Sequence, residues 1–351
     1  MAEKKILKGL TFEELRDWVQ EQGLERFRAA QIYSWLYAKR ASSFEEMTNL
    51  SKDLRRWLSE QADVGTLRIL ERTTSEQSGT VKYLLGLPDG RSVEAVYIPE
   101  EDRRTVCLSS QVGCPLACRF CATGQMGFVR NLETWEIVEQ LLTIERETRG
   151  RVTNVVFMGM GEPLLNYEAV VKAAKLISDE RGIAVSHRRI VISTAGLVRE
   201  IKRMADEGHR FRLAISLNAA DDDTRSELMP INRRHKIREL IEAAKYYYRK
   251  TRRRVTFEYV LLAGVNDRRR DAERLRSLLG DFPCKINLIP YNETVPEFRR
   301  PSAERVDRFR EWLHPLHAPV IVRWSRGDDI RAACGQLWSA RPKAVGVAVN
   351  R

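Results

Sequence analysis

Two hydrophobic patterns divide the chain. Up to about residue 64, apolar residues recur at helical spacing in three segments, residues 12–23, 28–40 and 50–61. The first segment follows Thr11 and has Glu14 three residues later, which is a capping-box pattern, and Gly23 is a natural helix end. The pattern therefore predicts a small helical accessory domain over residues 1–64.

Beyond residue 64 the pattern changes to strands. Residues 67–98 alternate apolar and polar positions, and Asp89-Gly90 between two such runs is a hairpin-turn signal. After Cys107, six continuously apolar runs alternate with amphipathic helical segments, which indicates six β–α units around a parallel sheet. Six units are fewer than the eight of a closed barrel. We therefore expect an α/β fold with a partial (β/α)6 barrel whose open side suits a macromolecular substrate.

The expected organisation has four parts. They are the accessory domain over residues 1–64, a β-hairpin extension over 65–100, the partial barrel over 101–340 and a tail over 341–351. A last strand over residues 318–325 and a helix over 328–337 are expected to end the barrel. A basic helical module ahead of an enzyme core can be a structural cap or can hold RNA, and the sequence leaves both roles open.

The charge balance favours a polyanionic partner. The 351 residues include 60 Lys and Arg against 48 Asp and Glu, a formal net charge of +12, and much of the excess is arginine in short clusters. Arginine binds phosphate through a planar fork as well as through charge, which favours an RNA backbone. No apolar stretch approaches the ~18 residues that span a bilayer, and the N-terminus lacks the apolar core of a secretory signal. We expect a cytoplasmic protein without membrane association.

Three of the six cysteines, Cys114, Cys118 and Cys121, are spaced C-x3-C-x2-C. Three thiolates at this spacing can hold three irons of a [4Fe–4S] cluster and leave the fourth iron without a protein ligand. With Phe120 inside the loop, the run resembles the signature of the radical S-adenosylmethionine (SAM) enzymes, in which the open iron binds SAM. A zinc knuckle is the competing interpretation, although zinc usually takes four ligands in paired spacings and no second pair is visible.

Small and polar residues follow the predicted strands, where parallel β/α folds place their ligand sites. Each of these loops alone is ordinary. In order, after a cluster loop, they outline a SAM site. The candidates are Gly161 and Glu162 for the amino group, Ser193 for the carboxylate, Ser216, Leu217 and Asn218 for the ribose, and Asn292 for the adenine.

The other three cysteines differ in their surroundings. Cys107 lies seven residues before Cys114, and Cys334 follows the polar turn at residues 326–329. A free cysteine is commonly a small buried hydrophobe. We assign that role to Cys284, which lies within an apolar strand run without polar neighbours.

Seven motifs carry a wider resemblance. They are VEAVYIPE, CLSSQVGCPLACRFCATG, GMGEPLLN, STAG, SLNA, LIPYN and RGDDIRAACGQL, in this order. From the N-terminal helices to CGQL, the chain resembles the radical SAM RNA methyltransferases of the RlmN/Cfr family, which methylate an adenosine carbon. The resemblance implies a helical accessory domain with a partial barrel, in agreement with the hydrophobic pattern. It also implies a [4Fe–4S] cluster on the three clustered cysteines and two molecules of SAM per turnover.

The resemblance implies roles for three further residues. Cys334 matches the cysteine that SAM methylates to S-methylcysteine, and whose methylene radical then adds to adenine carbon 2 and links protein and RNA. Cys107 matches the thiol that resolves this link through a transient disulfide with Cys334. Glu94 matches a glutamate proposed as proton acceptor. Adenine carbon 2 has no lone pair for an ordinary methyl transfer, so a radical route with a sulfur carrier suits the chemistry.

The resemblance therefore implies a cytoplasmic methyltransferase that acts on adenosine carbon 2 in 23S rRNA and in tRNA. It also implies a monomer that receives electrons from a flavodoxin-like donor. Cfr-type methylation at carbon 8 is one alternative, and a zinc-stabilised RNA-binding protein is an alternative of another class. The chain departs from some relatives in having Asn218 where they have histidine, and its tail is short and weakly basic.

Overall fold

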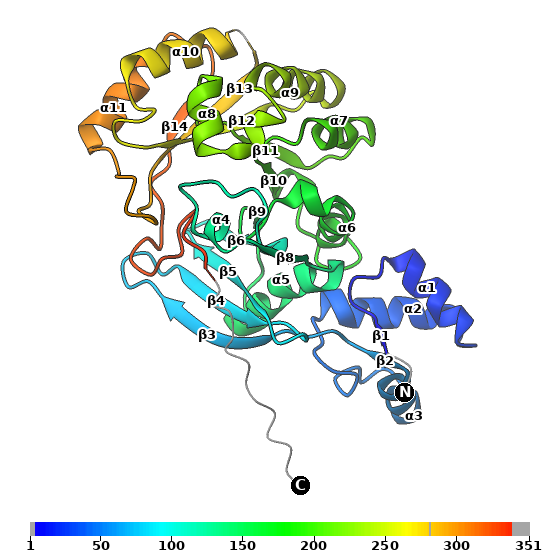
Figure 1. Ribbon diagram of the computed structural model, residues 1–351. Helices are drawn as coiled ribbons and strands as arrows, with labels where there is room; N and C mark the ends of the chain where they lie inside the picture. The colour runs from blue at the N-terminus through cyan, green and yellow to red at the C-terminus, as the bar shows by residue number, and fades with distance from the viewer. Residues whose placement is uncertain (1–3, 281, 339–351) are drawn as a thin grey trace.

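The computed structural model describes residues 4–280 and 282–338 of the chain (Figure 1). Its centre is a ten-stranded sheet in the order β14-β13-β12-β11-β10-β9-β6-β5-β4-β3. The strands are β3 (Arg68–Thr74), β4 (Val81–Gly86), β5 (Ser92–Pro99), β6 (Arg104–Cys107), β9 (Asn154–Phe157), β10 (Ile190–Thr194), β11 (Arg212–Ser216), β12 (Val255–Leu261), β13 (Cys284–Pro290) and β14 (Val320–Val322). The predicted tail, residues 341–351, lies outside the described residues.

The strands from β6 to β14 run parallel to their neighbours in the sheet. Their continuous apolar runs suit this position, because helices cover a parallel sheet and both faces of each strand need apolar side chains. In the described chain the two end strands, β14 and β3, do not pair with each other. The barrel is therefore open, which confirms the predicted fold class.

Helices connect the parallel strands. They are α5 (Thr134–Thr148), α6 (Tyr167–Ser178), α7 (Val198–Asp206), α8 (Asp222–Leu228), α9 (Ile237–Thr251), α10 (Arg269–Leu279) and α11 (Ala303–Trp312), with the 3-10 turns η2 (Pro163–Asn166), η3 (His187–Arg189) and η4 (Pro230–Arg233). A small excursion between β6 and α5 holds β7 (Gln111–Gly113), the four-residue α4 (Ala122–Gln125) and β8 (Phe128–Asn131). In the described part of the chain, no helix has both the length and the hydrophobicity that crossing a bilayer requires.

The predicted hairpin extension is continuous with the barrel sheet. Strands β3, β4 and β5 are antiparallel, and β5 pairs with β6, the first strand of the parallel part. Gly90 supplies the left-handed residue of the turn between β4 and β5, with φ of 78°. The Leu87 amide donates to the Arg91 carbonyl across this turn at 2.8 Å. The extension thereby forms one wall beside the barrel opening.

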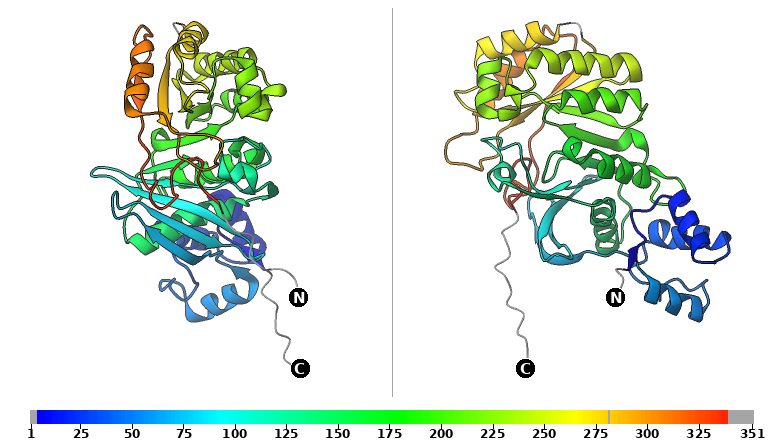
Figure 2. Two further views of the ribbon diagram at one scale, coloured as in Figure 1. Left: turned by 60° about the vertical axis from the view of Figure 1, so that its left-hand side comes forward. Right: turned by 45° about the vertical axis from the view of Figure 1, so that its right-hand side comes forward.

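The N-terminal segment forms a helical unit at one end of the molecule, next to α5 (Figure 2). Thr11 and Glu14 make the predicted capping box, with both reciprocal hydrogen bonds present. The second predicted helix begins as an α-helix and continues as a π-helix from Ser34. The elements are β1 (Lys5–Ile6), α1 (Phe12–Glu21), α2 (Phe27–Tyr33), η1 (Ser34–Ala38), α3 (Lys52–Gln61) and β2 (Ala62–Asp63).

Residues 328–337, which the sequence predicts as a helix, form a series of turns instead. Arg331 and Gly335 have φ of 53° and 84°, in the left-handed region that interrupts a helix. The Gly335 carbonyl accepts from the Ala122 amide at 2.7 Å, and the Leu337 carbonyl accepts from Thr123 Oγ1 at 2.7 Å. The helix prediction was wrong because these groups bind the cysteine loop rather than their own segment.

Candidate active site

The three clustered cysteines lie on the loop between β7 and β8. Gly113 ends β7 with φ of 75°, at a register shift in the β7–β8 pair. The next amide, that of Cys114, donates to the Gly127 carbonyl at 2.9 Å, so both ends of the loop meet. The Cys121 amide donates to the Cys118 carbonyl at 3.1 Å, and α4 follows directly. The loop is therefore a defined turn at the mouth of the barrel.

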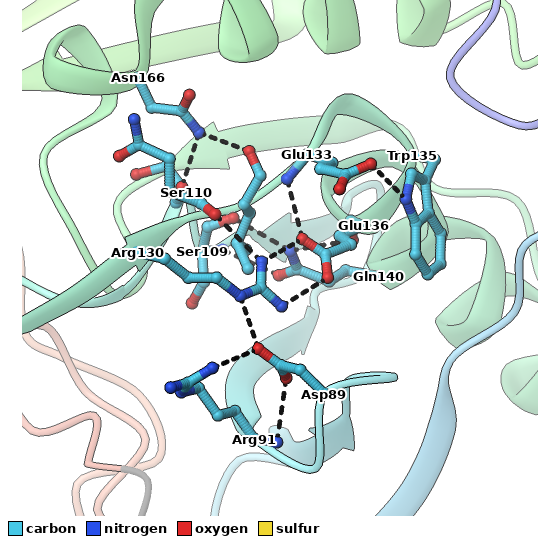
Figure 3. A network of polar contacts seen from close by, with 12 residues as sticks. Asp89, Arg91, Ser109, Ser110, Arg130, Glu133, Trp135, Glu136, Gln140 and Asn166 are labelled. Atoms are coloured by element: carbon cyan, nitrogen blue, oxygen red, sulfur yellow. Dashed lines mark hydrogen bonds and ion pairs between the residues drawn. The ribbon is translucent and has the colours of Figure 1, made fainter. Parts of the chain in front are cut away.

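A half-buried arginine holds the base of this loop. Arg130 of β8 donates to both carboxylate oxygens of Glu136 on α5, at 2.7 and 2.8 Å, and to Asp89 in the β4–β5 turn at 2.7 Å (Figure 3). The guanidinium thus joins β8 to α5 and to the hairpin extension. A planar guanidinium suits such a bridge because it presents several donors in fixed directions.

The chain between Cys107 and the cluster loop is held by side-chain amides. Gln140 of α5 exchanges two hydrogen bonds with the backbone of Ser109, at 2.9 and 3.0 Å. Asn166 donates to the carbonyls of Ser110 and Leu132, at 2.9 and 2.7 Å (Figure 3). These amides replace the ladder bonds that the backbone lacks after β6 ends. As a result, Cys107 and the cluster loop have fixed relative positions.

Burial disfavours the ionised form of all three clustered thiols. It raises the pKa of Cys114 to about 12 and also raises the pKa values of Cys118 and Cys121. Negative charge on Cys121 raises the pKa values of the other two further, so the three sulfurs lie within one another's field. Thiolates in such a place need a bound cationic centre.

The donor set fits an iron–sulfur cluster. In a [4Fe–4S] cluster each thiolate binds a different iron, so three sulfurs serve three corners. Phe120 and Leu116 belong to a separate apolar cluster in which Cys118 and Cys121 also pack, which provides a dry surrounding. Within residues 4–280 and 282–338, no group of three His, Cys, Asp or Glu side chains is arranged around a single ion position.

Cys334 lies beside the cluster loop although it is far along the chain. The bonds from Ala122 and Thr123 to residues 335 and 337 hold its segment there. The Asn292 side-chain amide also donates to the Cys334 carbonyl, at 3.1 Å. Cys334 keeps accessible surface, yet the surrounding protein raises its thiol pKa to about 11, first through loss of hydration. Cys334 is thus an accessible thiol that carries its proton at neutral pH.

Cys107 and Cys334 are near each other in space. Burial raises the pKa of Cys107, and the charge of Cys334 raises it further. Cys334 also lies in the field of Cys121, which belongs to the cluster loop. Both cysteines are free thiols. Cys284 is 1% exposed in the apolar core, as its strand run predicts.

Glu94 contacts the Cys334 segment directly. It lies on β5, and its Oε2 accepts from the Trp338 amide at 2.8 Å. Lys82, on the neighbouring strand β4, lies 3.2 Å from Glu94 Oε1. Burial raises the pKa of Glu94, while the charge of Lys82 opposes this rise. The structure therefore brings Glu94 into contact with the segment that carries Cys334.

The candidate SAM residues lie at the carboxyl ends of β9, β10, β11 and β13, along one edge of the sheet. Gly161 has φ of 99°, and a Cβ there would lie 2.6 Å from the Gln111 side chain. Glu162 accepts from the Ala195 amide at 2.7 Å and from the Leu164 amide at 3.0 Å. Its burial raises the pKa to about 7. These contacts orient the carboxylate at the edge where the strands end.

The remaining candidates differ in what their side chains contact. Ser193 and Ser216 lie in the last two positions of β10 and β11. Leu217 is buried in the core, and its amide and carbonyl already bind Glu258 and Arg225. Asn218, with φ of 57°, accepts from the Val260 amide at 2.9 Å, and Asn292 donates to Ser325 at 2.9 Å. Both amides serve to brace neighbouring loops.

Sequence reasoning missed two buried charged residues. Arg225 of α8 is fully buried and donates to the carbonyls of Leu217, at 2.9 Å, and Ala195, at 2.6 Å; burial lowers its pKa to about 10. Glu258 of β12 lies in the field of both Cys107 and Cys334, and burial raises its pKa. A carboxylate inside the apolar run of residues 254–262 was a signal for Glu258. Nothing in the sequence around Arg225 marks its burial.

Comparison with known proteins gives a consistent result. Residues 108–275 match the radical SAM superfamily, and residues 6–64 match the ribosomal RNA large subunit methyltransferase N-terminal domain. Two relatives are each named "Dual-specificity RNA methyltransferase RlmN". The one from Pelobacter propionicus is 48% identical over 338 residues, 96% of either chain. The one from Geobacter sulfurreducens is 50% identical, over 94% of this chain and 91% of its own.

A solved structure is similar over almost the whole chain. It is a radical SAM methyltransferase from Sphaerobacter thermophilus, with 45% identity and a TM-score of 0.92. The alignment covers 95% of this chain and 99% of that one. The helical unit, the sheet extension and the open barrel therefore recur together in that protein.

Proposed function

This chain belongs to the RlmN family of radical SAM RNA methyltransferases, and we propose that it methylates carbon 2 of an adenosine in 23S rRNA and in tRNA. The radical SAM fold and a cofactor set of one [4Fe–4S] cluster and SAM come with the family. The net charge of +12 suits an RNA substrate. The high identity to proteins named RlmN favours carbon 2 over the Cfr-type carbon 8.

One observation carries the chemistry in this proposal. Hydrogen bonds from Ala122 and Thr123 hold the Cys334 segment against the proposed cluster loop, and Cys334 is near enough to Cys107 for its charge to raise the Cys107 pKa. A zinc-stabilised RNA-binding protein would not need this arrangement. A methyl carrier does need it, because it must meet the radical source on one side and the resolving thiol on the other.

The proposed roles follow from these positions. A cluster on Cys114, Cys118 and Cys121, together with SAM, supplies the methyl group and the one-electron chemistry. Cys334 receives the methyl on Sγ and carries the carbon to the adenine. Glu94, held beside this segment, accepts the proton lost from carbon 2.

Cys107 completes the cycle. Its sulfur attacks the Cys334 sulfur to form a disulfide, and the sulfur–carbon bond to the RNA breaks. The released carbon takes up the proton that the Cys107 thiol gives up, which leaves a methylated base. Burial keeps the Cys107 thiol protonated, which protects it until the adduct forms nearby. The disulfide is transient in this proposal, in keeping with the two free thiols.

The proposal assigns SAM to the edge formed by the carboxyl ends of β9, β10, β11 and β13. The contacts are those of Gly161, Glu162, Ser193, Ser216, Leu217, Asn218 and Asn292. It also includes a flavodoxin-like electron donor, a monomeric enzyme and the cytoplasm, whose reducing conditions suit free clustered thiols. Residues 1–64 are proposed to assist RNA binding.

Mass spectrometry of methylated RNA tests this function. Holoenzyme with SAM and a reductant is supplied with RNA carrying deuterium at adenosine carbon 2, and with RNA carrying it at carbon 8. We expect one methyl per target adenosine with loss of the carbon-2 deuterium only. Loss of the carbon-8 deuterium instead would show that the protein catalyses the Cfr-type reaction. The comparison of RNA from cells with and without the gene locates the same methyl in vivo.

A further inference from the structure

A cavity lies beside residues 331–338, and two of its lining residues, Lys82 and Trp338, also contact Glu94. Its volume is about 470 Å³, and its lining includes Lys82, Gln125, Arg331, Gln336 and Trp338. Ala122, which follows Cys121 directly, also lines it. None of the lining residues in the described part of the chain is acidic. Because Lys82 is paired with Glu94, Arg331 supplies the positive charge available to a ligand, beside one large aromatic side chain.

Trp338 is held at this cavity by its backbone while its ring remains available. The Trp338 amide donates to Glu94 at 2.8 Å, which fixes the residue to β5. Its side chain is 49% exposed. Exposed indole surface beside cations suits an unpaired base, because bases stack on aromatic faces and their phosphates attract lysine and arginine.

The position relative to Cys334 decides which nucleotide fits. Arg331 and Gln336, on either side of Cys334 in the chain, line the cavity, whereas Cys334 itself does not. The target adenine must meet the carbon on Cys334. The cavity thus lies beside Cys334 without including it, so we assign it to a nucleotide next to the target adenosine rather than to the target base.

We propose that this cavity is a subsite for an unpaired nucleotide adjacent to the target adenosine, with its base stacked on Trp338 and its phosphate held by Arg331. This inference rests on the proposed function, since it names how the same site holds its RNA. It explains how an open barrel holds a single-stranded segment while one base enters. The subsite reads a stacked base and a phosphate, so it tolerates different bases at this position.

Equilibrium binding of a labelled single-stranded oligoribonucleotide with one central adenosine to the holoenzyme tests the subsite. We expect Trp338→Ala to weaken binding about 10-fold and Trp338→Phe to retain most of the affinity, since a smaller ring still stacks. Trp324 is 54% exposed and does not line the cavity, so Trp324→Ala is the matched control and should bind as wild type. Arg331→Gln should lower the slope of log Kd against log salt by about one.

Failure of the subsite and failure of the proposed function would give different results. If Trp338→Ala binds as tightly as wild type, or if Trp324→Ala weakens binding equally, the subsite is wrong while RNA methylation by wild type is unaffected. An equal loss of RNA affinity in Trp338→Ala and Trp338→Phe would also exclude stacking of a base on this side chain. If wild-type holoenzyme methylates no RNA at all, the proposed function itself fails.

Discussion

At the scale of single residues, the surroundings of a sulfur decide what it does. Cys284 lies in the apolar core of β13, and the charges near it do not include another thiol. Cys107 is buried and Cys334 is accessible, and each feels the charge of another sulfur and of Glu258. Of these cysteines, only Cys107 and Cys334 can exchange sulfur bonds, because exchange needs one thiol within reach of the other.

Substitution of the two thiols should therefore give different products with RNA. In Cys107→Ala the covalent RNA–protein adduct should form and persist, since no thiolate remains to release it. Cys334→Ala should form no adduct, because the carrier sulfur is gone. Denaturing gels of holoenzyme incubated with SAM and RNA measure this, with Cys284→Ala as a control that turns over normally. Normal turnover in Cys107→Ala would make that cysteine structural only.

The charge beside Glu94 should set the pH dependence of methylation. Burial raises the pKa of Glu94 and Lys82 lowers it, so removal of Lys82 raises it further. A proton acceptor must be ionised, and the acidic limb of the rate profile should therefore move to higher pH in Lys82→Met. Rates at saturating RNA measure the midpoint of that limb. Lys82→Arg keeps the positive charge and should restore the wild-type midpoint. An unchanged midpoint in Lys82→Met would show that Glu94 is not the proton acceptor.

At the scale of elements, the short β7–β8 hairpin positions the cluster loop. Its closure depends on Gly113, because a Cβ there would lie 1.9 Å from the Gly127 carbonyl oxygen. That carbonyl is the acceptor for the Cys114 amide. The same turn contains Gly127, with φ of 73°, where a Cβ would meet no other atom within 4 Å. Gly113 and Gly127 thus have similar left-handed backbones but differ in the space available for a Cβ atom.

This difference predicts unequal effects of alanine. Gly127→Ala should lower the free energy of unfolding by about 1–2 kcal/mol, the cost of left-handed backbone alone. Gly113→Ala adds the collision and should cost about 4 kcal/mol or more, with loss of bound iron after anaerobic reconstitution. Thermal unfolding and iron content measure the pair. Equal effects of the two substitutions would contradict the close approach at Gly113.

At the scale of the whole molecule, buried charges join the accessory unit to the barrel. Lys8, near the N-terminus, lies 2.6 Å from Glu139 on α5, and both side chains are fully buried. Burial lowers the pKa of Lys8, and Glu139 opposes this. A second contact, Lys172 of α6 with Glu14 of α1 at 2.6 Å, is exposed to solvent. Arg40 with Glu145 and Arg181 with Glu13 also join the two units, so Lys8–Glu139 and Lys172–Glu14 serve as one buried and one exposed example.

We expect the buried pair to matter more to stability. Lys8→Met leaves Glu139 buried with less compensation and should cost about 3 kcal/mol of unfolding free energy. Lys172→Met should cost about 1 kcal/mol or less, because water screens that pair. Denaturant unfolding of both variants gives the comparison. If Lys172→Met is as destabilising as Lys8→Met, burial does not govern the contact between the units.

Local elements and their order follow from sequence patterns that span only a few residues. Thr11 with Glu14 specifies a helix start, Asp89-Gly90 a hairpin turn, and the apolar runs a parallel sheet, because each depends on neighbours a few residues apart. The spacing of Cys114, Cys118 and Cys121 is local in the same way. For these features, propensity and hydrophobic period were sufficient.

Contacts between residues far apart in the chain depend on the folded molecule instead. Residues 328–337 have a helical composition, but their carbonyls bind the loop at Ala122 and Thr123, and that long-range gain outweighs helix propensity. The same contacts bring Cys334 beside Cys107. The contact of Glu94 with the Trp338 amide and the burial of Arg225 also join segments far apart in the chain. No local sequence pattern predicts such contacts, because they form and stabilise the protein only when the folded barrel has brought both partners together.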